Sequence, residues 1–305
     1  MRIGIVGLGW VGSSVAISTL HSGVAKELLL HDIREEIAEG EAMDLAHGAA
    51  FYPYAEVRST SLSEMAGCDA VVVAAGRGGS AGESRLDLLR ENAAIVASIA
   101  GELSGLEGLL ILVTNPVDVM VRVAAEASGL PRERVMGTGT MLDTARLRQA
   151  VGGELGVEPR SVHAQVVGEH GDSEVVLWSG ARIGGVSLAS WEGWSPERQD
   201  VVTERVRRAA YEIIARKGAT NHAIGLVTAA LLRWSHRGGG RVLTVSRVQE
   251  GALGLHGVAL SLPTVVDTKG AVRVLTPEVA DGERAALLRS AEVLEEAWAQ
   301  LGWTG

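Results

Sequence analysis

Residues 2–12 decide the first part of the fold, and they have the sequence RIGIVGLGWVG. The mostly apolar run RIGIV is typical of a buried strand, and the residues after the last glycine suit a helix. Gly7, Gly9 and Gly12 thus form a G-x-G-x-x-G motif between a strand and a helix. In this setting the first glycine permits a tight turn and the second lets a pyrophosphate approach the backbone. The third glycine allows the helix to pack closely on the strand.

An acidic residue stands at the position that a dinucleotide requires. Asp32 ends the next apolar run, about 20 residues after Gly12, where a carboxylate can accept hydrogen bonds from a ribose diol. Its charge would repel a 2′-phosphate, so the pattern predicts NAD as the cofactor in preference to NADP. The alternative is a glycine-rich turn and a solvated Asp in an α/β protein that binds no nucleotide.

Length and composition limit the class of protein. The chain has 305 residues, of which 47% are hydrophobic and 21% charged, and its formal net charge is −9. This length favours two domains and is ample for a buried core. The negative charge argues against a nucleic-acid partner, which calls for basic patches. Residues 3–25 contain no Asp, Glu, Lys or Arg, but their glycines would weaken a helix, so we expect neither a signal peptide nor a membrane span.

Cysteine usage excludes two kinds of structural support. Cys68 is the only cysteine, so the chain can form no internal disulfide and no cysteine-based zinc site. We expect this thiol to be buried and unreactive, which fits a reducing compartment. No metal site is predicted.

In the first half, continuous apolar runs alternate with segments of helical spacing. Continuous rather than alternating runs are typical of strands buried on both faces of a parallel sheet. Their alternation with helices predicts right-handed crossovers and a Rossmann-type, doubly wound parallel sheet. The predicted strands are Ile3–Val6, Leu28–Leu30, Ala70–Ala75 and Leu109–Val113, and the predicted helices include Ile33–His47 and Leu86–Leu103.

After about Thr138 the pattern changes to a mixture of helices and strands. We therefore predict a cofactor-binding domain in residues 1–138 and a mixed α+β substrate domain in residues 139–305. Helical segments are expected at Leu142–Val151, Pro196–Lys217, Thr220–Trp234 and Pro277–Leu301, and strands at VHAQVVG (residues 162–168), Arg241–Arg247 and Ala252–Leu262.

Three segments of the chain contain candidate catalytic side chains. Arg85 begins a predicted helix after the flexible, glycine-rich loop GRGGSAGES. Asp143 and Arg146 are three residues apart and so share one helix face, although a plain surface ion pair is the alternative. His170 directly follows a predicted buried strand, between Gly168 and Gly171.

With these residues in place, the sequence resembles the L-lactate/malate dehydrogenase family over nearly its whole length. The motifs are VTNPVDV (113–119), GTGTMLDTARLR (137–148), GEHGDSEV (168–175) and KGAT (217–220), in family order and at family distances. The GEHGD and KGAT motifs are closer to the lactate branch than to the malate branch. The resemblance implies NAD as cofactor, a cytoplasmic location and a homotetramer built as a dimer of dimers, with a dimer as the alternative.

The resemblance also assigns roles to individual residues. It makes His170 the general acid/base, oriented by Asp143, and it makes Arg146 the clamp on the substrate carboxylate. These roles agree with elementary chemistry, because an imidazolium can protonate a developing alkoxide near neutral pH. A carboxylate behind the imidazole fixes its tautomer and raises its pKa. A planar guanidinium binds a carboxylate through two hydrogen bonds, which Lys cannot do.

Further residues of the site follow from the same resemblance. Arg85 would be carried by a mobile loop and polarise the reacting carbonyl, Asn115 would help to hold that carbonyl and the cofactor, and Thr220 would line the substrate pocket. Arg148 and His163 match positions at which some bacterial relatives bind a sugar bisphosphate effector between subunits. Relatives that lack this regulation can carry the same residues, so both interpretations stay open.

The sequence departs from the family six residues before Arg85. Lactate-type relatives typically have Gln there and malate-type relatives have Arg, whereas this chain has Gly79. Without a positive charge, a second substrate carboxylate would be buried unpaired, unless Arg77 reaches it. Gly79 also leaves room for a larger substrate.

We therefore predict an NAD-dependent L-2-hydroxy acid dehydrogenase of the lactate type. A bulkier 2-hydroxy acid and malate are the alternative substrates. A nucleotide-binding protein without turnover is the alternative from another class, and the set of acid/base and arginine residues argues against it.

Overall fold

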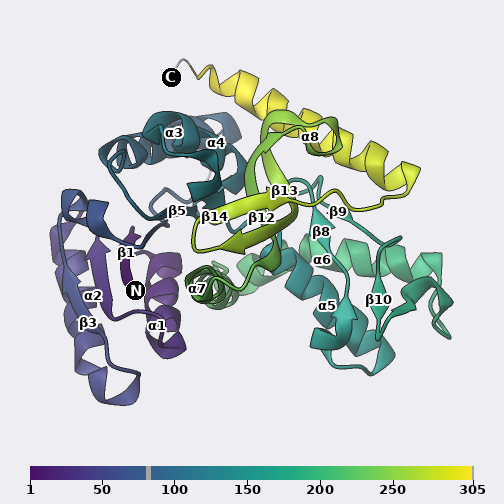
Figure 1. The fold of residues 1–305 in the computed structure, drawn as a ribbon, viewed down its shortest axis with the longest axis horizontal. Helices are drawn as coiled ribbons and strands as arrows, with labels where there is room; N and C mark the ends of the chain where they lie inside the picture. Colours follow the sequence, from purple (N-terminus) through teal and green to yellow (C-terminus); the bar gives the residue numbers. More distant parts are fainter. Residues whose placement is uncertain (80–83, 304–305) are drawn as a thin grey trace.

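The computed structural model describes residues 1–79 and 84–303. Its central feature is a nine-stranded sheet with the strand order β14-β13-β12-β6-β5-β4-β1-β2-β3 (Figure 1). The strands are β1 (Arg2–Val6), β2 (Glu27–His31), β3 (Glu56–Ser59), β4 (Ala70–Val73), β5 (Leu109–Leu112), β6 (Val135–Gly137), β12 (Arg241–Glu250), β13 (His256–Asp267) and β14 (Gly270–Val274).

The first six strands run parallel, and β12, β13 and β14 extend them as an antiparallel meander. β1 lies between β2 and β4, so the strand order reverses there. In open α/β sheets a ligand binds outside the carboxyl ends of the strands at such a reversal. The predicted Rossmann-type parallel sheet is thereby confirmed.

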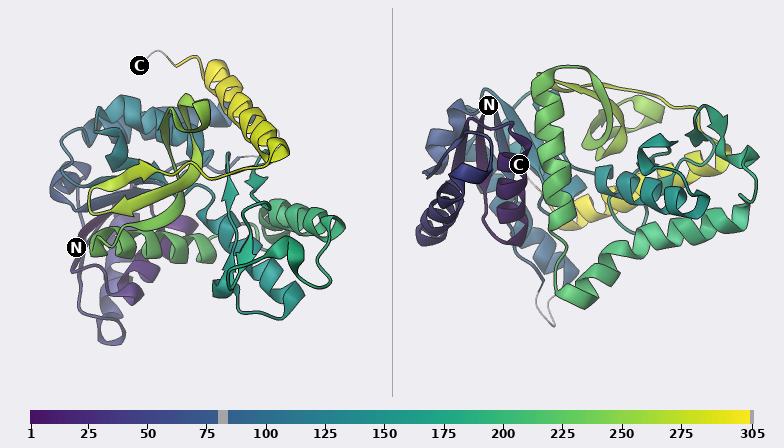
Figure 2. Two further views of the ribbon diagram at one scale, coloured as in Figure 1. Left: turned by 45° about the vertical axis from the view of Figure 1, so that its right-hand side comes forward. Right: turned by 90° about the horizontal axis from the view of Figure 1, so that it is seen from below.

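Helices cover both faces of this sheet. Figure 1 shows α3 and α4 on one side and α1 and α7 on the other. Figure 2 shows α6 and α7 as two long green helices that run in different directions. The helices are α1 (Trp10–Ser22), α2 (Glu35–His47), α3 (Arg85–Glu102), α4 (Val117–Ser128), α5 (Met141–Leu155), α6 (Pro196–Lys217), α7 (His222–Arg237) and α8 (Asp281–Leu301).

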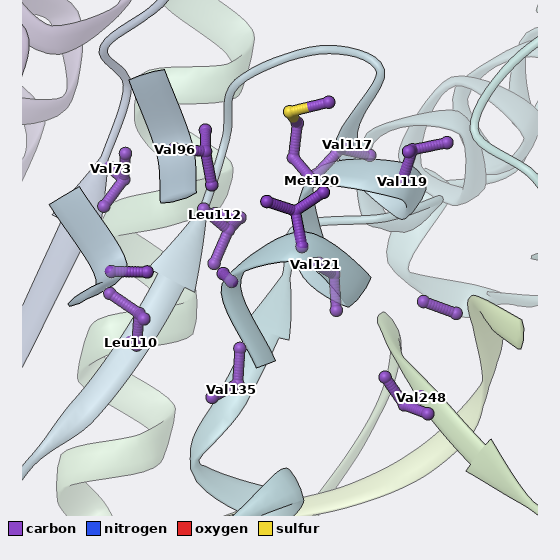
Figure 3. Packing of buried hydrophobic residues seen from close by; sticks show 14 of the residues in the cluster. Val73, Val96, Leu110, Leu112, Val117, Val119, Met120, Val121, Val135 and Val248 are labelled. Atoms are coloured by element: carbon purple, nitrogen blue, oxygen red, sulfur yellow. The ribbon is translucent and has the colours of Figure 1, made fainter. Parts of the chain in front are cut away.

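The side chains of β5 explain why its apolar run is continuous. Leu110 and Leu112 belong to the core between the sheet and α3, α4 and α8, and Figure 3 shows them close to side chains of α4 and β6. Leu109 and Ile111 point to the opposite face and join the core beneath α1, α2 and α7. Because alternate residues face opposite sides of a strand, burial on both faces requires every position to be apolar.

A smaller, separate core lies beneath α5 and α6. Short strands complete this part of the chain, in a three-stranded sheet of β11, β10 and β7 and a pair of β8 and β9. Their bounds are β7 (Val162–His163), β8 (Val166–Val167), β9 (Val175–Val176), β10 (Arg182–Ile183) and β11 (Val186–Ser187). The helix predicted from Pro277 begins at Asp281.

Three strands of the second half differ from their expected placement. Residues 241–274 were expected within a separate α+β half, but they form β12, β13 and β14 at the edge of the first sheet. The junction is a single residue pair, in which Ser246 of β12 lies opposite Gly137 of β6. In the described part of the chain, every helix is too short or too polar to cross a membrane.

Candidate active site

The glycine motif forms a closely packed turn between β1 and α1. Gly7 has φ +88°, and a Cβ there would lie 2.4 Å from the backbone of Ala75. A Cβ on Gly12 would lie 1.8 Å from the carbonyl oxygen of Gly7. A Cβ on Gly9 would instead meet no atom of the described residues within 4 Å. The turn therefore requires glycine at the first and third positions, and at the second it leaves space for a pyrophosphate against the backbone.

The predicted acidic residue lies against the same turn. Asp32 follows β2, and its Oδ2 accepts the backbone N–H of Leu8 at 2.8 Å. Its Oδ1 accepts the N–H of Arg34 at 3.1 Å. These bonds fix the carboxylate beside the glycine turn, where it can accept hydrogen bonds from a ribose. The glycine turn and Asp32 thus fit NAD. The turn would hold its pyrophosphate, and Asp32 would bind its ribose.

One buried carboxylate links the candidate acid/base to the candidate substrate clamp. Asp143 of α5 bonds His170 Nδ1 through Oδ2 at 2.6 Å and Arg146 Nη1 through Oδ1 at 2.8 Å. With a proton on Nδ1 donated to the carboxylate, the other ring nitrogen of His170 is left for a substrate. The structure thus brings together three predicted residues from two separate segments.

The backbone of the His170 segment is held independently of its side chain. The N–H of His170 donates to Oδ2 of Asp118 on α4 at 2.7 Å. Two residues earlier, Gly168 exchanges two backbone hydrogen bonds with Ser261 of β13, at 2.9 and 3.0 Å. A Cβ on Gly168 would lie 2.7 Å from Ser290 Oγ, so the segment passes close beneath α8. The backbone around His170 is therefore hydrogen-bonded to α4 and to β13.

These contacts set the charges of the pair. Burial opposes a positive charge on His170, but the Asp143 carboxylate outweighs it and raises the pKa of the imidazole from 6.5 to about 9. Burial likewise opposes the charge on Asp143, yet His170 and Arg146 lower its pKa below the usual value. At neutral pH the pair is therefore an imidazolium and a carboxylate.

A cavity of about 560 Å³ opens beside this pair. Its wall includes Arg85 at the first position of α3, Asn115 after β5, and Arg77 and Gly79 after β4. Because β1, β4 and β5 are parallel neighbours, the segments that follow them meet at one edge of the sheet. The cavity and the glycine turn therefore adjoin. Residues 80–83, the middle of the predicted mobile loop, lie outside the described residues.

Three other predicted residues lie away from this cavity. Thr220 is half-buried in the connection between α6 and α7 and is not among the described residues that line the cavity. Arg148 lines a second cavity of about 470 Å³ and donates from Nε to the carbonyl of Ala164 at 3.0 Å. His163 is exposed on β7, opposite Arg182 of β10.

Several polar residues of the site were not predicted from the sequence. Asp118 holds the His170 backbone, and Glu174, Arg207 and Tyr211 line the cavity. Both acidic residues were inside quoted motifs, VTNPVDV and GEHGDSEV, so position within a motif was the available signal. Nothing in the pattern of α6 distinguished Arg207 or Tyr211 from other polar residues on that helix.

A dinucleotide cradle that adjoins a charged imidazole and two arginines defines a class of protein, the NAD-linked dehydrogenases that act on a carbonyl beside a carboxylate. Comparison with known families agrees. Residues 1–137 match the model described as lactate/malate dehydrogenase, NAD binding domain. Residues 140–301 match lactate/malate dehydrogenase, alpha/beta C-terminal domain. The chain belongs to the lactate/malate dehydrogenase family.

Individual relatives resemble it over almost their whole length. The L-lactate dehydrogenase of Thermus aquaticus is 44% identical over 310 residues, which cover 99% of this chain and 100% of that protein. The L-lactate dehydrogenase of Kosmotoga olearia is 43% identical and covers 97% and 95%, respectively.

Solved structures show the same fold. The minor L-lactate dehydrogenase from Enterococcus mundtii, in a ligand-bound form, has a TM-score of 0.95 at 37% identity, over 98% of this chain and 97% of that chain. A lactate dehydrogenase from a Medee basin deep-sea metagenome library has a TM-score of 0.96 at 36% identity, over 99% of both. The protein is thus an NAD-dependent 2-hydroxy acid dehydrogenase, and the predicted family, cofactor and class of activity are confirmed.

Proposed function

We propose that this protein interconverts pyruvate and L-lactate. The proposal rests on the arrangement in which Asp143 holds both the imidazole of His170 and the guanidinium of Arg146. A 2-oxo acid carries its carboxylate next to its carbonyl, so it needs a cation and a proton donor side by side. The names of the relatives, L-lactate dehydrogenases, support the same substrate.

Each side chain then has a defined task in pyruvate reduction. Arg146 binds the substrate carboxylate, using the guanidinium nitrogens that Asp143 does not occupy. His170, charged at neutral pH, donates its second ring proton to the carbonyl oxygen, and in the reverse reaction it accepts that proton. When bound, NADH supplies the hydride that reaches the carbonyl carbon.

Arg85 and Asn115 complete the proposed environment of the carbonyl. A guanidinium beside the carbonyl oxygen stabilises the negative charge that develops there, and it does so more strongly once water is excluded. Arg85 lies at the N-terminus of α3, whose first turn is capped by Ser84 Oγ accepting the N–H of Asp87 at 3.1 Å. Its position therefore depends on the segment that precedes α3. We also propose that Thr220 lines the pocket once the substrate is bound.

The part of the cavity lining that follows β4 supports a small or apolar substituent on the substrate. Gly79 contributes no side chain there, and the guanidinium of Arg77 forms an ion pair with Glu91 of α3. A second substrate carboxylate would have to compete with Glu91 for this guanidinium, which disfavours oxaloacetate. Because Gly79 adds no side chain to this lining, a bulkier 2-oxo acid is the second candidate substrate.

Substitution of Gly79 tests this proposal. We expect the wild type to have a higher kcat/KM for pyruvate or 2-oxoisocaproate than for oxaloacetate, and Gly79→Arg to reverse the order by a factor of roughly 10²–10³. Among the described residues, the new Cβ would meet only Leu88 Cδ2, at 3.3 Å, which is the end of a flexible side chain. Gly79→Leu is the matched control, because it adds bulk without charge. A wild type that prefers oxaloacetate would refute the lactate assignment.

We also propose an anionic effector at Arg148 and His163, on the strength of the family resemblance. The second cavity that Arg148 lines contains the further cations Arg160 and Arg241, which suits a phosphorylated ligand. The test is the KM for pyruvate with and without fructose 1,6-bisphosphate. An unchanged KM in the wild type would refute the proposal.

We propose further that the chain self-associates as a homotetramer, through a surface that includes α1 and α7. Trp10 of α1 and Leu226 of α7 are each 65% exposed, so each offers apolar surface that a second copy of the chain could cover. Light scattering that gave a monomer mass at micromolar concentration would refute this. We also propose a domain boundary near residue 138. A cytoplasmic location is proposed as well, and it fits the free thiol of Cys68.

A further inference from the structure

Glu174 is a buried acidic residue that the proposed reaction does not use. It directly precedes β9, lines the cavity that contains His170, and is only 5% exposed. Its Oε1 has no hydrogen-bond partner within the described part of the chain. A buried carboxyl oxygen without a partner is costly, so its retention inside a substrate cavity calls for an explanation.

Charged groups of both signs face this carboxyl group. Asp143 and Arg146 approach it from α5, Arg207 from α6, and His170 from its own segment. Burial, followed by the negative charge of Asp143, raises the pKa of Glu174 to about 8, and the three cations offset only part of this. At neutral pH Glu174 is therefore a neutral carboxylic acid that faces the carboxylate of Asp143.

Asp172 and Tyr211 also line this cavity, and they are paired with each other. Asp172 Oδ1 accepts the hydroxyl proton of Tyr211 at 2.9 Å, which joins the His170 segment to α6. That bond, together with burial, raises the pKa of Tyr211 above its usual value of 10, so the phenol stays protonated at neutral and mildly alkaline pH. Glu174 is thus a cavity carboxyl group whose charge changes near pH 8.

Building on the proposed function, we propose that Glu174 is a positioning residue that must be protonated for the substrate to bind. In its neutral form it leaves the guanidinium of Arg146 available to the carboxylate of the 2-oxo acid. As an anion it would attract that guanidinium and repel the incoming carboxylate. Substrate affinity would therefore depend on two protons, one on His170 and one on Glu174, whereas proton transfer to the substrate depends on His170 alone.

The proposal separates KM from kcat in a pH titration. An acid with a pKa of about 8 is ionised in roughly ten of eleven molecules at pH 9, so this group should raise the KM for pyruvate about tenfold between pH 7 and 9. The proton on His170, with its pKa of about 9, adds only about a factor of two over the same range. kcat, measured at saturating pyruvate, should not show the break near pH 8.

The central experiment measures KM and kcat for pyruvate from pH 6.5 to 9.5 in the wild type and in Glu174→Gln. The amide keeps the size of the side chain and cannot ionise, so we expect its KM at pH 6.5 to be within about twofold of the wild type. Between pH 7 and 9 the variant should lose most of the tenfold rise. Glu212→Gln is the matched control, since Glu212 pairs with Arg216 on the exposed side of α6, and it should keep the wild-type profile. A tenfold rise that persists in Glu174→Gln would overturn the proposal.

An infrared titration tests the protonation without turnover and without the variant having to fold. In the NADH complex of the wild type, one carboxylic C=O stretching band should disappear between pH 7 and 9. Asp118, whose pKa burial raises to about 6, has already lost its proton at the start of that range. If no carboxylic band is lost between pH 7 and 9, the proposal is wrong. If the band behaves as expected but no 2-oxo acid consumes NADH, then the proposed function fails and the ionisation of Glu174 stands.

Discussion

Removing the charge of Asp143 should move the pH dependence of the reaction by a predictable amount. Asp143 is the group that raises the pKa of His170 from 6.5 to about 9, against the effect of burial. That difference corresponds to a factor of roughly 300 in proton affinity, or about 3 kcal/mol. In Asp143→Asn burial remains and the carboxylate is gone, so the pKa of His170 should lie at or below 6.5.

The sign of the effect depends on the direction of the reaction. Pyruvate reduction needs the imidazolium, so its kcat at saturating pyruvate should fall as the pH rises through about 9 in the wild type and through about 6.5 or lower in Asp143→Asn. At pH 7.5 about a tenth or less of the variant imidazole is charged, which predicts at least a tenfold loss that acidification to pH 5.5 largely restores. Lactate oxidation needs the neutral imidazole, so its optimum should move to lower pH as well.

The assay is kcat in both directions, from pH 5 to 10 with saturating substrate and cofactor. Asp172→Asn is the control, because Asp172 lines the same cavity but bonds Tyr211 instead of the imidazole. It should keep the wild-type break near pH 9. A break that stays near pH 9 in Asp143→Asn would show that some other group charges His170, and the reasoning would be refuted.

Three further predictions concern other parts of the site. His170→Gln should bind NADH with unchanged affinity, by fluorescence titration, while turnover falls by roughly 10²–10⁴, and a variant that keeps most of its turnover would exclude His170 as the acid/base. The kcat/KM for NADH should exceed that for NADPH by at least about tenfold, and Asp32→Ser should reduce this ratio. Equal wild-type values for the two cofactors would mean that Asp32 does not contact the ribose. Gly9→Ala should leave the thermal unfolding midpoint unchanged and weaken NADH binding. Gly12→Ala, with its Cβ 1.8 Å from a backbone oxygen, should lower both the midpoint and the affinity for NADH. Equal midpoints of the two variants would contradict the described turn.

Strands that are buried on both faces were predictable because their sequences are continuously apolar. β5, with the sequence LLIL, is such a case. β3 and β6 were not predicted, since β3 has the polar sequence EVRS at the sheet edge and β6 has only three residues. The attachment of β12 to β6 was also beyond prediction, because a single register pair joins segments more than a hundred residues apart.

The site shows the same division between local and tertiary information. Spacing on one helix placed Asp143 and Arg146 together, and the family resemblance, not spacing, connected them to His170. Asp118 was missed because an acidic residue in the first turn of a helix is already explained by the helix dipole. Glu174 was missed because a Glu in a polar connection is normally solvated, and only the packing of α5 and α6 around it shows that it is buried.

The family and the geometry of the site together imply that this chain moves hydride between NAD and the second carbon of an L-2-hydroxy acid. The most direct measurement supplies pyruvate and NADH deuterated at the transferred position, then analyses the product by chiral chromatography and mass spectrometry. We expect L-lactate that carries one deuterium at C2, in a one-to-one ratio to the NADH consumed. Formation of D-lactate, or product without deuterium at C2, would contradict this mechanism.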